Sequence, residues 1–255
     1  MNDTLIQAMV EVKLNEPDDF LKVRETLTRI GIASRKEKTL FQSCHILHKQ
    51  GKYYTVHFKE LFALDGKTGE LCSDFGENGK VDLRDGLGTH NPAYYYSVSP
   101  PAIIGNLIIV GGGVADNVST SVPGGVVRAY DVVTGDLVWY WDPIPPNQEP
   151  IIDEDGNQLY QRGTTNVWSI ISTDPELNLI YLPTGNTAAD NYGGHRNGSD
   201  YYSSSVVALN ASTGKVVWHF QTVHHDIWDY DVPVSYTHLR AHETRHDLVC
   251  RLLLE

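Results

Sequence analysis

Arg128-Ala129-Tyr130-Asp131-Val132-Val133-Thr134-Gly135 has the pattern of a strand that ends in a tight turn. The pattern recurs at residues 62–69 and 207–214, where Asp or Asn again begins the turn and Thr-Gly ends it. Each copy predicts a hairpin, because an Asp or Asn side chain closes such a turn and glycine adopts the backbone conformation that ends it. Trp139 and Trp218 follow the second and third glycines by four residues, and we expect each indole to pack against a neighbouring hairpin.

Repeated hairpins of this kind predict the blades of a β-propeller, which are four-stranded units arranged around an axis. The turn glycines are 66 and 79 residues apart, so loops are inserted between the copies. Residues 103–110 and 178–183 predict further strands. We expect a mainly β fold with a few blades, because the 174 residues from 62 to 235 are too few for a closed ring.

Charge divides the chain into three segments, which we expect to be separate domains. Residues 1–61 carry a net charge of +2, residues 62–235 carry −14, and residues 236–255 are balanced, which gives −12 in total. All five tryptophans lie in the middle segment. Such a step in composition indicates segments of different origin.

Cysteine spacing and hydropathy predict neither a cross-linked nor a membrane-spanning chain. Cys44, Cys72 and Cys250 form no Cys-x-x-Cys pair, so neither a disulfide framework nor a zinc ribbon is expected. The sequence shows no signal peptide and no apolar run of membrane-spanning length. We therefore expect the chain, as written, to be cytoplasmic.

The first segment predicts a small α+β unit. Residues 10–14 alternate as a strand does, and Pro17 with its flanking acids begins a helix that Gly31 ends. Residues 39–47 and 53–58 predict two strands joined by a turn at residues 50–52.

Four runs in this segment carry a resemblance, namely Pro17-Asp18-Asp19-Phe20-Leu21-Lys22-Val23, Glu25-Thr26-Leu27-Thr28-Arg29, Gln42-Ser43-Cys44-His45-Ile46-Leu47 and Gly51-Lys52-Tyr53-Tyr54. Residues 9–61 resemble the N-terminal half of the RegA family of phage translational repressors, which bind single-stranded mRNA. The basic pair expected before the proline is Asn15-Glu16 here, and a net charge of +2 is small for a nucleic-acid surface. We interpret the segment as a structural remnant, and RNA binding is the alternative function. No DNA partner is expected.

An acidic and aromatic loop, His224-His225-Asp226-Ile227-Trp228-Asp229-Tyr230-Asp231, directly follows the last predicted strand. A carboxylate in such a loop suits a positioned base beside a flat ligand. The alternative is a solvated loop whose Trp packs into the core.

Polar residues also follow the other strands. Asp116 and Asn117 come after a run of three glycines, Asn166 and Trp168 follow a Gly-Thr-Thr loop, and Asn186 ends a strand. Carboxylate and amide oxygens suit a hard cation such as Ca²⁺ or Mg²⁺. Each group alone is typical of an ordinary turn.

In this order, the motifs resemble the pyrroloquinoline quinone (PQQ) dehydrogenases, particularly the membrane-bound glucose and quinate dehydrogenases. The matching residues are Ser99-Pro100-Pro101-Ala102-Ile103-Ile104, Asp116-Asn117, Gly124 to Arg128, Asn166-Val167-Trp168, Tyr181 to Asn186 and Gln221 to Asp229. The family folds as an eight-bladed propeller. The resemblance therefore implies a partial eight-bladed propeller at residues 62–235, preceded by the α+β segment and followed by a short helical or disordered tail.

The resemblance also implies roles for individual residues. Asp229 would be the catalytic base, and Trp168, Asn166 and Asp116 would contact PQQ. Asp116, Asn117 and Asn186 would hold Ca²⁺ or Mg²⁺. Asp231 stands where some relatives have a lanthanide ligand, and the resemblance assigns it no role here.

The same resemblance implies oxidation of a sugar or polyol, with ubiquinone as electron acceptor, by an inner-membrane enzyme whose catalytic domain is periplasmic. We expect the chain by itself to be inactive, because an open propeller leaves strand edges and half of a cofactor site exposed.

The last segment contains His242-Glu243-Thr244-Arg245-His246, which matches the His-Glu-x-x-His pattern of zinc enzymes. Residues 235–255 also resemble a translated sequencing adapter, so we interpret them as a non-native tail without a zinc site.

Overall fold

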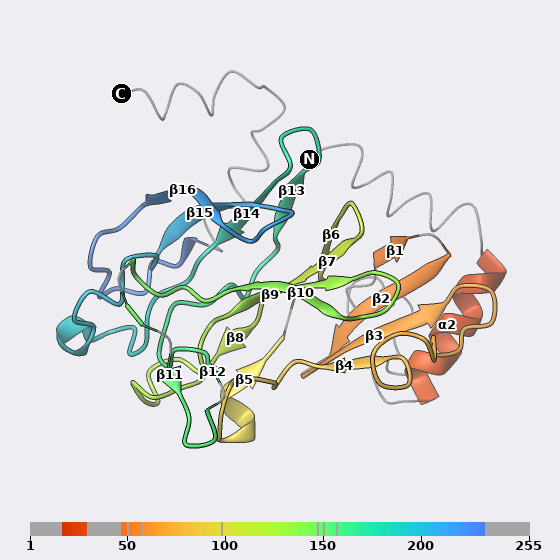
Figure 1. Cartoon of the computed structure of the whole chain (residues 1–255), viewed down its shortest axis with the longest axis horizontal. Coiled ribbons are helices and arrows are strands. Elements are labelled where there is room, and N and C mark those ends of the chain that lie inside the picture. The colour runs from red at the N-terminus through yellow and green to blue at the C-terminus, as the bar shows by residue number, and fades with distance from the viewer. Residues whose placement is uncertain are drawn as a thin grey trace.

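The computed structural model describes residues 17–29, 47–49, 51–57, 59–97, 99–146, 148–149, 151–156 and 158–232. Three antiparallel sheets of four strands each make up most of this part of the chain. Figure 1 shows the sheets following one another across the molecule, with one helix beside the first sheet. Strand 10–14, most of strand 39–47 and the tail from 236 onward lie outside the described residues.

Each sheet is a simple meander, in which every strand pairs with the next strand of the same sheet along the chain. The first sheet contains β1 (Leu47–Lys49), β2 (Lys52–His57), β3 (Glu60–Asp65) and β4 (Lys80–Asp82). The second contains β6 (Ala102–Ile104), β7 (Leu107–Val110), β9 (Val127–Asp131) and β10 (Leu137–Trp141). The third contains β13 (Ser172–Asp174), β14 (Leu179–Pro183), β15 (Ser205–Asn210) and β16 (Val216–Gln221). This is the strand order expected of propeller blades, and the described sheets form no closed ring.

Short elements connect the sheets. Two ribbons form between β5 (Tyr95–Tyr96) and β8 (Gly113–Val114), and between β11 (Ile151–Ile152) and β12 (Gln158–Leu159). Two 3-10 turns, η2 (Pro92–Tyr94) and η3 (Gly193–His195), lie in the loops. Helix α2 (Pro17–Arg29) begins at the predicted proline. In the described part of the chain, no helix has the length and apolar character needed to cross a bilayer.

The repeated turn has the same hydrogen bonds in all three sheets. In the second sheet, the Asp131 carboxylate accepts the backbone N–H groups of Val133 and Thr134 at 2.7 and 3.0 Å. Gly135 then donates its N–H to the Asp131 carbonyl at 3.0 Å and has a φ of +75°. Asp65 and Asn210 make the equivalent bonds in the other sheets. The backbone bonds hold the pKa of Asp131 below its usual value, so the carboxylate stays ionised and keeps the turn closed.

A second set of hydrogen bonds connects this turn to the turn between the first and second strands of each sheet. The N–H of Val132 donates to the carbonyl of Asn106, between β6 and β7, at 3.0 Å. The equivalent bonds run from Ala211 to Asn178 at 2.9 Å and from Gly66 to Gly51 at 2.7 Å.

The repressor-like hairpin β1–β2 therefore occupies the place and register of β6–β7 and β13–β14. Ala63 of β3 pairs with Tyr54 of β2, as Ala129 pairs with Ile109 and Ala208 with Tyr181. The predicted boundary between residues 61 and 62 falls inside β3.

Neighbouring sheets are joined by aromatic side chains that reach across. Trp139 donates its indole N–H to the Ala211 carbonyl at 2.8 Å and packs over the turn at Gly214. Trp218 behaves differently from the expectation, because its ring lies 6.0 Å from Tyr181 in its own sheet. Tyr54 joins the first two sheets by donating to the Val132 carbonyl at 2.7 Å.

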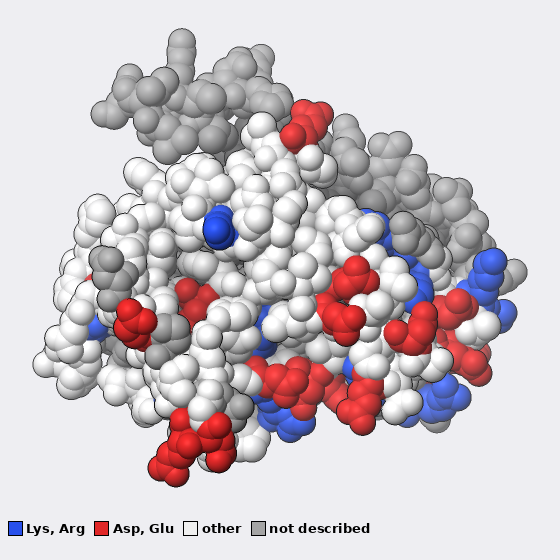
Figure 2. Space-filling model, viewed as in Figure 1, with Lys and Arg blue, Asp and Glu red and all other residues white. Residues whose placement is uncertain are grey.

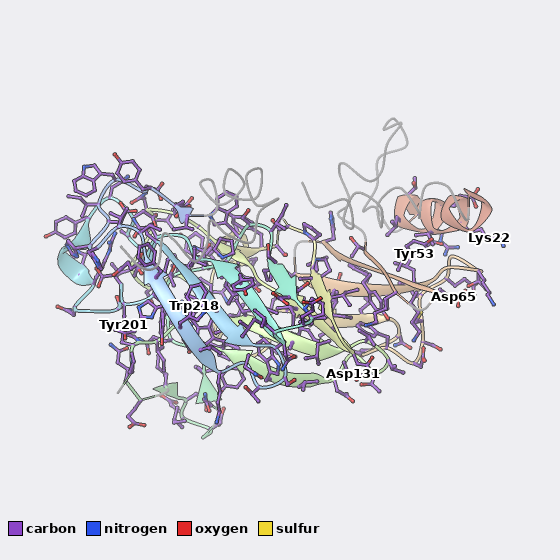
Figure 3. The ribbon with its side chains drawn as sticks, turned by 90° about the horizontal axis from the view of Figure 1, so that it is seen from above. Lys22, Tyr53, Asp65, Asp131, Tyr201 and Trp218 are labelled. Carbon is purple, nitrogen blue, oxygen red and sulfur yellow. The ribbon has the colours of Figure 1, made fainter. Side chains whose placement is uncertain are left out.

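Helix α2 packs beside the first sheet through Val23 and Leu27, which are fully buried. Lys22 donates to the Lys67 carbonyl at 2.8 Å, in the turn that follows Asp65. Figure 3 shows Lys22 and Asp65 at the same end of the molecule. The repressor-like segment is thus packed onto the blade that it completes.

Two glycines bring the second and third sheets close together at the site described below. A Cβ atom added to Gly125 would overlap the Thr165 carbonyl oxygen and the Asn166 Cα atom. A Cβ added to Gly111 would overlap the Val167 carbonyl oxygen. Since both obstacles are main-chain atoms, only glycine lets the segment 165–167 lie against these loops.

We expect Tyr54→Phe to lower the free energy of unfolding by about 1–3 kcal/mol, because it leaves the buried Val132 carbonyl without its donor. Urea denaturation of the full chain measures the change. Tyr192→Phe is the matched control, since Tyr192 is 60% exposed. Equal stability of Tyr54→Phe and the control would show that the first hairpin does not pack on the second sheet.

We expect Gly125→Ala to cost about 3 kcal/mol or more, because the main chain at Thr165 cannot move away without disturbing the third sheet. Gly156→Ala is the control. Gly156 has a φ of +83° and open space around it, so the change should cost only about 1 kcal/mol of backbone strain. A cost at Gly125 no greater than at Gly156 would contradict the close approach of the two segments.

Candidate functional site

A cavity of about 230 Å³ lies at the ribbon between β5 and β8. Its lining residues come from three places in the chain: the ribbon, the loop after β8, and the segment before β13. They are Tyr96, Gly113, Val114, Asp116, Asn166 and Trp168. All three residues predicted to contact the cofactor, Asp116, Asn166 and Trp168, therefore line the same cavity.

Trp168 is held at both ends. Its indole N–H donates to Asp231 Oδ2 at 2.9 Å, and its carbonyl accepts a hydrogen bond from the Ser99 hydroxyl at 2.6 Å. Gly113 faces the start of the side chain, where an added Cβ would lie 3.4 Å from Trp168 Cβ. The ring can therefore form one wall of the cavity with little bulk opposite its base.

Asn166 is 4% exposed, and its side-chain oxygen Oδ1 is buried without a hydrogen-bond partner among the described residues. Its carbonyl accepts the N–H of Gly185 at 2.8 Å, which ties the segment to the end of β14. A buried amide oxygen that lacks a donor is costly unless a ligand or ion satisfies it.

Four carboxylates influence one another around the cavity. Burial and the negative charge of Asp229 raise the pKa of Asp116. Burial, followed by the charges of Asp116 and Asp229, raises the pKa of Asp190 to about 6. Burial also raises the pKa of Asp231 to about 6, although its bond from Trp168 acts in the opposite direction. Carboxylates gathered in this way favour either a proton or a cation between them.

Asp229 does not line the cavity but lies near it, on the exposed loop after β16. Its negative charge contributes to the raised pKa values of Asp116, Asp190 and Asp231. Its φ of +60° is unusual for a residue other than glycine. Such backbone strain is common at functional sites and requires surrounding contacts to hold it.

Asn117 is tied to the loop after β14. Its backbone N–H donates to Asp190 Oδ2 at 3.0 Å, and its side-chain oxygen accepts the N–H of Asn191 at 3.1 Å. It is not among the residues that line the cavity.

Asn186 is 2% exposed, and its side-chain amide makes four bonds within the protein. The oxygen accepts from the Thr187 N–H and the Ser203 hydroxyl, each at 2.9 Å. The nitrogen donates to the carbonyls of Asp190 and Asp226 at 3.0 and 3.1 Å. In this arrangement the amide joins two loops and offers no free lone pair to an ion.

Sequence reasoning assigned no role to the residues that hold the loop carrying Asp229. Arg196 is 3% exposed and donates to the carbonyls of Ala189, Asp190 and Asp226. Asp226 is fully buried and accepts the Ser204 hydroxyl at 2.8 Å. Its carboxylate also accepts the N–H groups of Trp228 and Tyr230, both at 2.9 Å.

This turn could have been anticipated, because an aspartate commonly accepts the N–H two residues later. The contacts of Arg196 carry no such local signal. Trp228 is 61% exposed, which excludes the reading of this loop as one whose Trp packs into the core. The two imidazoles contact other side chains, His224 at Gln221 and His225 at Asp200.

Some of the ligands that a hard cation needs are present at the cavity. Asp116 and Asn166 line the same cavity, and carboxylate and amide oxygens have the right chemistry for Ca²⁺ or Mg²⁺. Within the described ranges, no three His, Cys, Asp or Glu side chains are close enough to hold a metal on their own. Amide oxygens and oxygens of a bound cofactor would have to complete the coordination.

Comparison with known proteins shows the family to which the chain is related. A family model described as the PQQ glucose/ethanol/alcohol dehydrogenase β-propeller domain matches residues 24–247. The quinate/shikimate dehydrogenase (quinone) of Acinetobacter baylyi is 45% identical over 177 residues, which is 69% of this chain and 22% of that protein. The chain thus spans about a fifth to a quarter of the length of such relatives.

A solved structure shares the fold. The quinohaemoprotein alcohol dehydrogenase of Pseudomonas putida HK5 has a TM-score of 0.57 and 28% identity, over 74% of this chain and 28% of that one. The partial-propeller prediction is therefore confirmed.

The N-terminal resemblance is confirmed as well. The translation repressor protein of Escherichia phage RB69 is 68% identical over 59 residues, which is 23% of this chain and 48% of that protein. The match to the propeller model nevertheless covers more than half of the sequence. The chain belongs to the PQQ-dependent glucose/ethanol/alcohol dehydrogenase β-propeller family.

Proposed function

We propose that this chain carries part of the catalytic pocket of a PQQ-dependent dehydrogenase that oxidises a sugar or polyol. The observation that carries the proposal is that an indole, a carboxylate and an amide side chain, whose oxygen has no partner among the described residues, line one cavity. These are Trp168, Asp116 and Asn166, which come from segments far apart in the sequence. A flat wall beside oxygen donors suits an aromatic, acidic cofactor with a bound cation.

The chain's own residues would act in three ways. The face of Trp168 would support the cofactor ring, and Asn166 and Asp116 would hold its oxygens and a Ca²⁺ or Mg²⁺ ion. Asp229 would accept the proton of the substrate hydroxyl, since it is exposed to an incoming substrate and close enough to act on Asp116. Bound PQQ, polarised by the cation, would supply the hydride acceptor.

The names of the relatives support a substrate class. Proteins named quinate/shikimate dehydrogenase, glycerol dehydrogenase and glucose dehydrogenase match this chain at 39–45% identity. We extend the proposal to a cyclic polyol or sugar as substrate and to a quinone as final acceptor. The repressor-like segment is similar to a translation repressor, and its β2 is built into the first sheet through main-chain pairing with β3.

We expect Ca²⁺ or Mg²⁺ to stabilise the chain in a pH-dependent manner. Asp190 and Asp231 have pKa values of about 6, and that of Asp116 is also raised. The folded state therefore holds protons more firmly than the unfolded state. Its free energy of unfolding should fall as the pH rises from about 4 to about 6. A cation that binds the ionised carboxylates offsets this loss.

The measurement is the Tm with and without cation at two pH values. We expect a rise of about 5 °C at about pH 7 under near-saturating cation, and little change at about pH 4. Asp116→Asn should remove most of the rise, whereas Asp136→Asn, an exposed site with the same charge change, should not. An equal rise in both variants would exclude Asp116 as a ligand.

We expect the full chain to bind PQQ in the presence of Ca²⁺ or Mg²⁺ without sustained turnover of glucose or quinate, because an open propeller completes only part of the pocket. Quenching of tryptophan fluorescence measures binding, and reduction of a dye acceptor measures turnover. Asp229→Asn should leave PQQ binding unchanged, because Asp229 does not line the cavity.

Failure of the wild-type chain to bind PQQ would reject the proposed function. Turnover that Asp229→Asn abolishes would instead overturn the expected inactivity and support Asp229 as the base.

A further inference from the structure

We propose that Asp231 is a positioning residue that fixes the plane of the Trp168 indole and so determines the surface offered to the cofactor. The inference rests on the proposed function only for the cofactor's identity. The anchoring itself is a property of the chain.

Asp231 joins two separate segments through its two oxygens. Oδ2 accepts the Trp168 indole N–H at 2.9 Å, and Oδ1 accepts the backbone N–H of Asn186 at 2.7 Å. The second bond holds the carboxylate in one orientation, because it anchors the other oxygen to the main chain. A carboxylate anchored in this way can in turn hold the ring.

The indole N–H is the only hydrogen-bonding group of a tryptophan side chain, so this bond is the one polar restraint available to the ring. The Ser99 hydroxyl fixes the Trp168 carbonyl and thus the backbone. It leaves the two side-chain torsions free. On the cavity side, Gly113 presents no side chain that could hold the ring.

Gly185 makes room for the pair. A Cβ added at this position would lie 2.9 Å from Asp231 Oδ1 and 3.4 Å from Trp168 Nε1. The φ of Gly185 is not positive, so the glycine is needed here for space rather than for its backbone conformation. The main chain at the end of β14 thus forms the surface on which the carboxylate and the indole meet.

This arrangement gives Asp231 a different role from that of a metal ligand. Both of its oxygens point at N–H donors, and it is not among the residues that line the cavity. A cation at this carboxylate would compete with the indole N–H for Oδ2. Anchoring of Trp168 and coordination of a lanthanide therefore predict opposite results when Asp231 is changed.

The first test needs no cofactor. The near-ultraviolet circular dichroism of wild type minus that of Trp168→Phe isolates the Trp168 signal in the full chain. We expect Asp231→Ala to remove most of this signal and to change nothing further in a Trp168→Phe background. Asp136→Asn is the control, and far-ultraviolet spectra confirm folding. An undiminished Trp168 signal in Asp231→Ala would overturn the proposal.

Asp231→Asn provides a second variant if Asp231→Ala does not fold. Its single side-chain oxygen can accept only one of the two N–H groups without placing an amide nitrogen against the other. We expect a reduced Trp168 signal, and an unchanged signal would again overturn the proposal.

The second test uses PQQ with Ca²⁺ as the probe. We expect Asp231→Ala to raise the dissociation constant about ten-fold or more in the wild-type background and less than about two-fold in the Trp168→Phe background. Equal effects in both backgrounds would show that Asp231 acts independently of Trp168.

Eu³⁺ or Tb³⁺ luminescence provides the counter-test. Direct excitation of the ion measures its binding without Trp168 as sensitiser. Lanthanide binding that is lost in Asp231→Ala and kept in Trp168→Phe would identify Asp231 as a ligand and overturn the positioning role. If wild type does not bind PQQ, the proposed function fails while the cofactor-free spectra still decide the anchoring.

Discussion

The backbone hydrogen bonds that close the Asp/Asn-x-x-Thr-Gly turns set the register of all three sheets, and the position of the site follows from that register. Successive strands of a meander run in opposite directions. The start of each first strand and the ends of each second and fourth strand therefore lie at one edge. Asn166 and Trp168 precede β13, Asp116 follows β7 and the short strand β8, and the Asp226–Asp231 loop follows β16. Fixing the register with three short turns thus brings distant polar residues to the same edge.

The acidic residues at this edge repel one another, so the site favours the binding of protons or cations. Among the described residues, acidic side chains outnumber basic ones, and on the face shown in Figure 2 they gather mainly at the lower and right-hand side. At the site, Asp116, Asp190 and Asp231 all have raised pKa values, with burial as the first cause. Arg196 is the buried cation nearby, yet it is hydrogen-bonded to carbonyls and not to these carboxylates. Arg196 therefore holds the loops at Asp190 and Asp226 without neutralising the carboxylates near the cavity through hydrogen bonds.

The sequence predicted the parts of this structure that depend on local patterns. The turns at Asp131 and Asn210, helix α2 and the packing of Trp139 all follow from spacing or from residue type. Asp116, Asn166 and Trp168 were assigned from the resemblance to the PQQ dehydrogenases, because each polar group alone is typical of an ordinary turn. The orientation of the Asn117 and Asn186 amides was not predictable. Their partners lie in loops whose path is set by tertiary contacts, and the same is true of the carbonyls that Arg196 binds.

The first sheet shows what a blade requires of its inner strands. Residues that match a phage repressor at high identity pair with β3 in the same register as β7 with β9 and β14 with β15. Three kinds of contact place this hairpin. Main-chain bonds pair β2 with β3, the Gly51 carbonyl accepts the Gly66 N–H, and the buried Tyr54 donates its hydroxyl to the second sheet. The first sheet therefore accepts an inner hairpin whose sequence resembles that of a different protein family. In this chain, a hairpin of different origin meets the blade's requirements, because its turn accepts the Gly66 N–H and its Tyr54 hydroxyl reaches the second sheet.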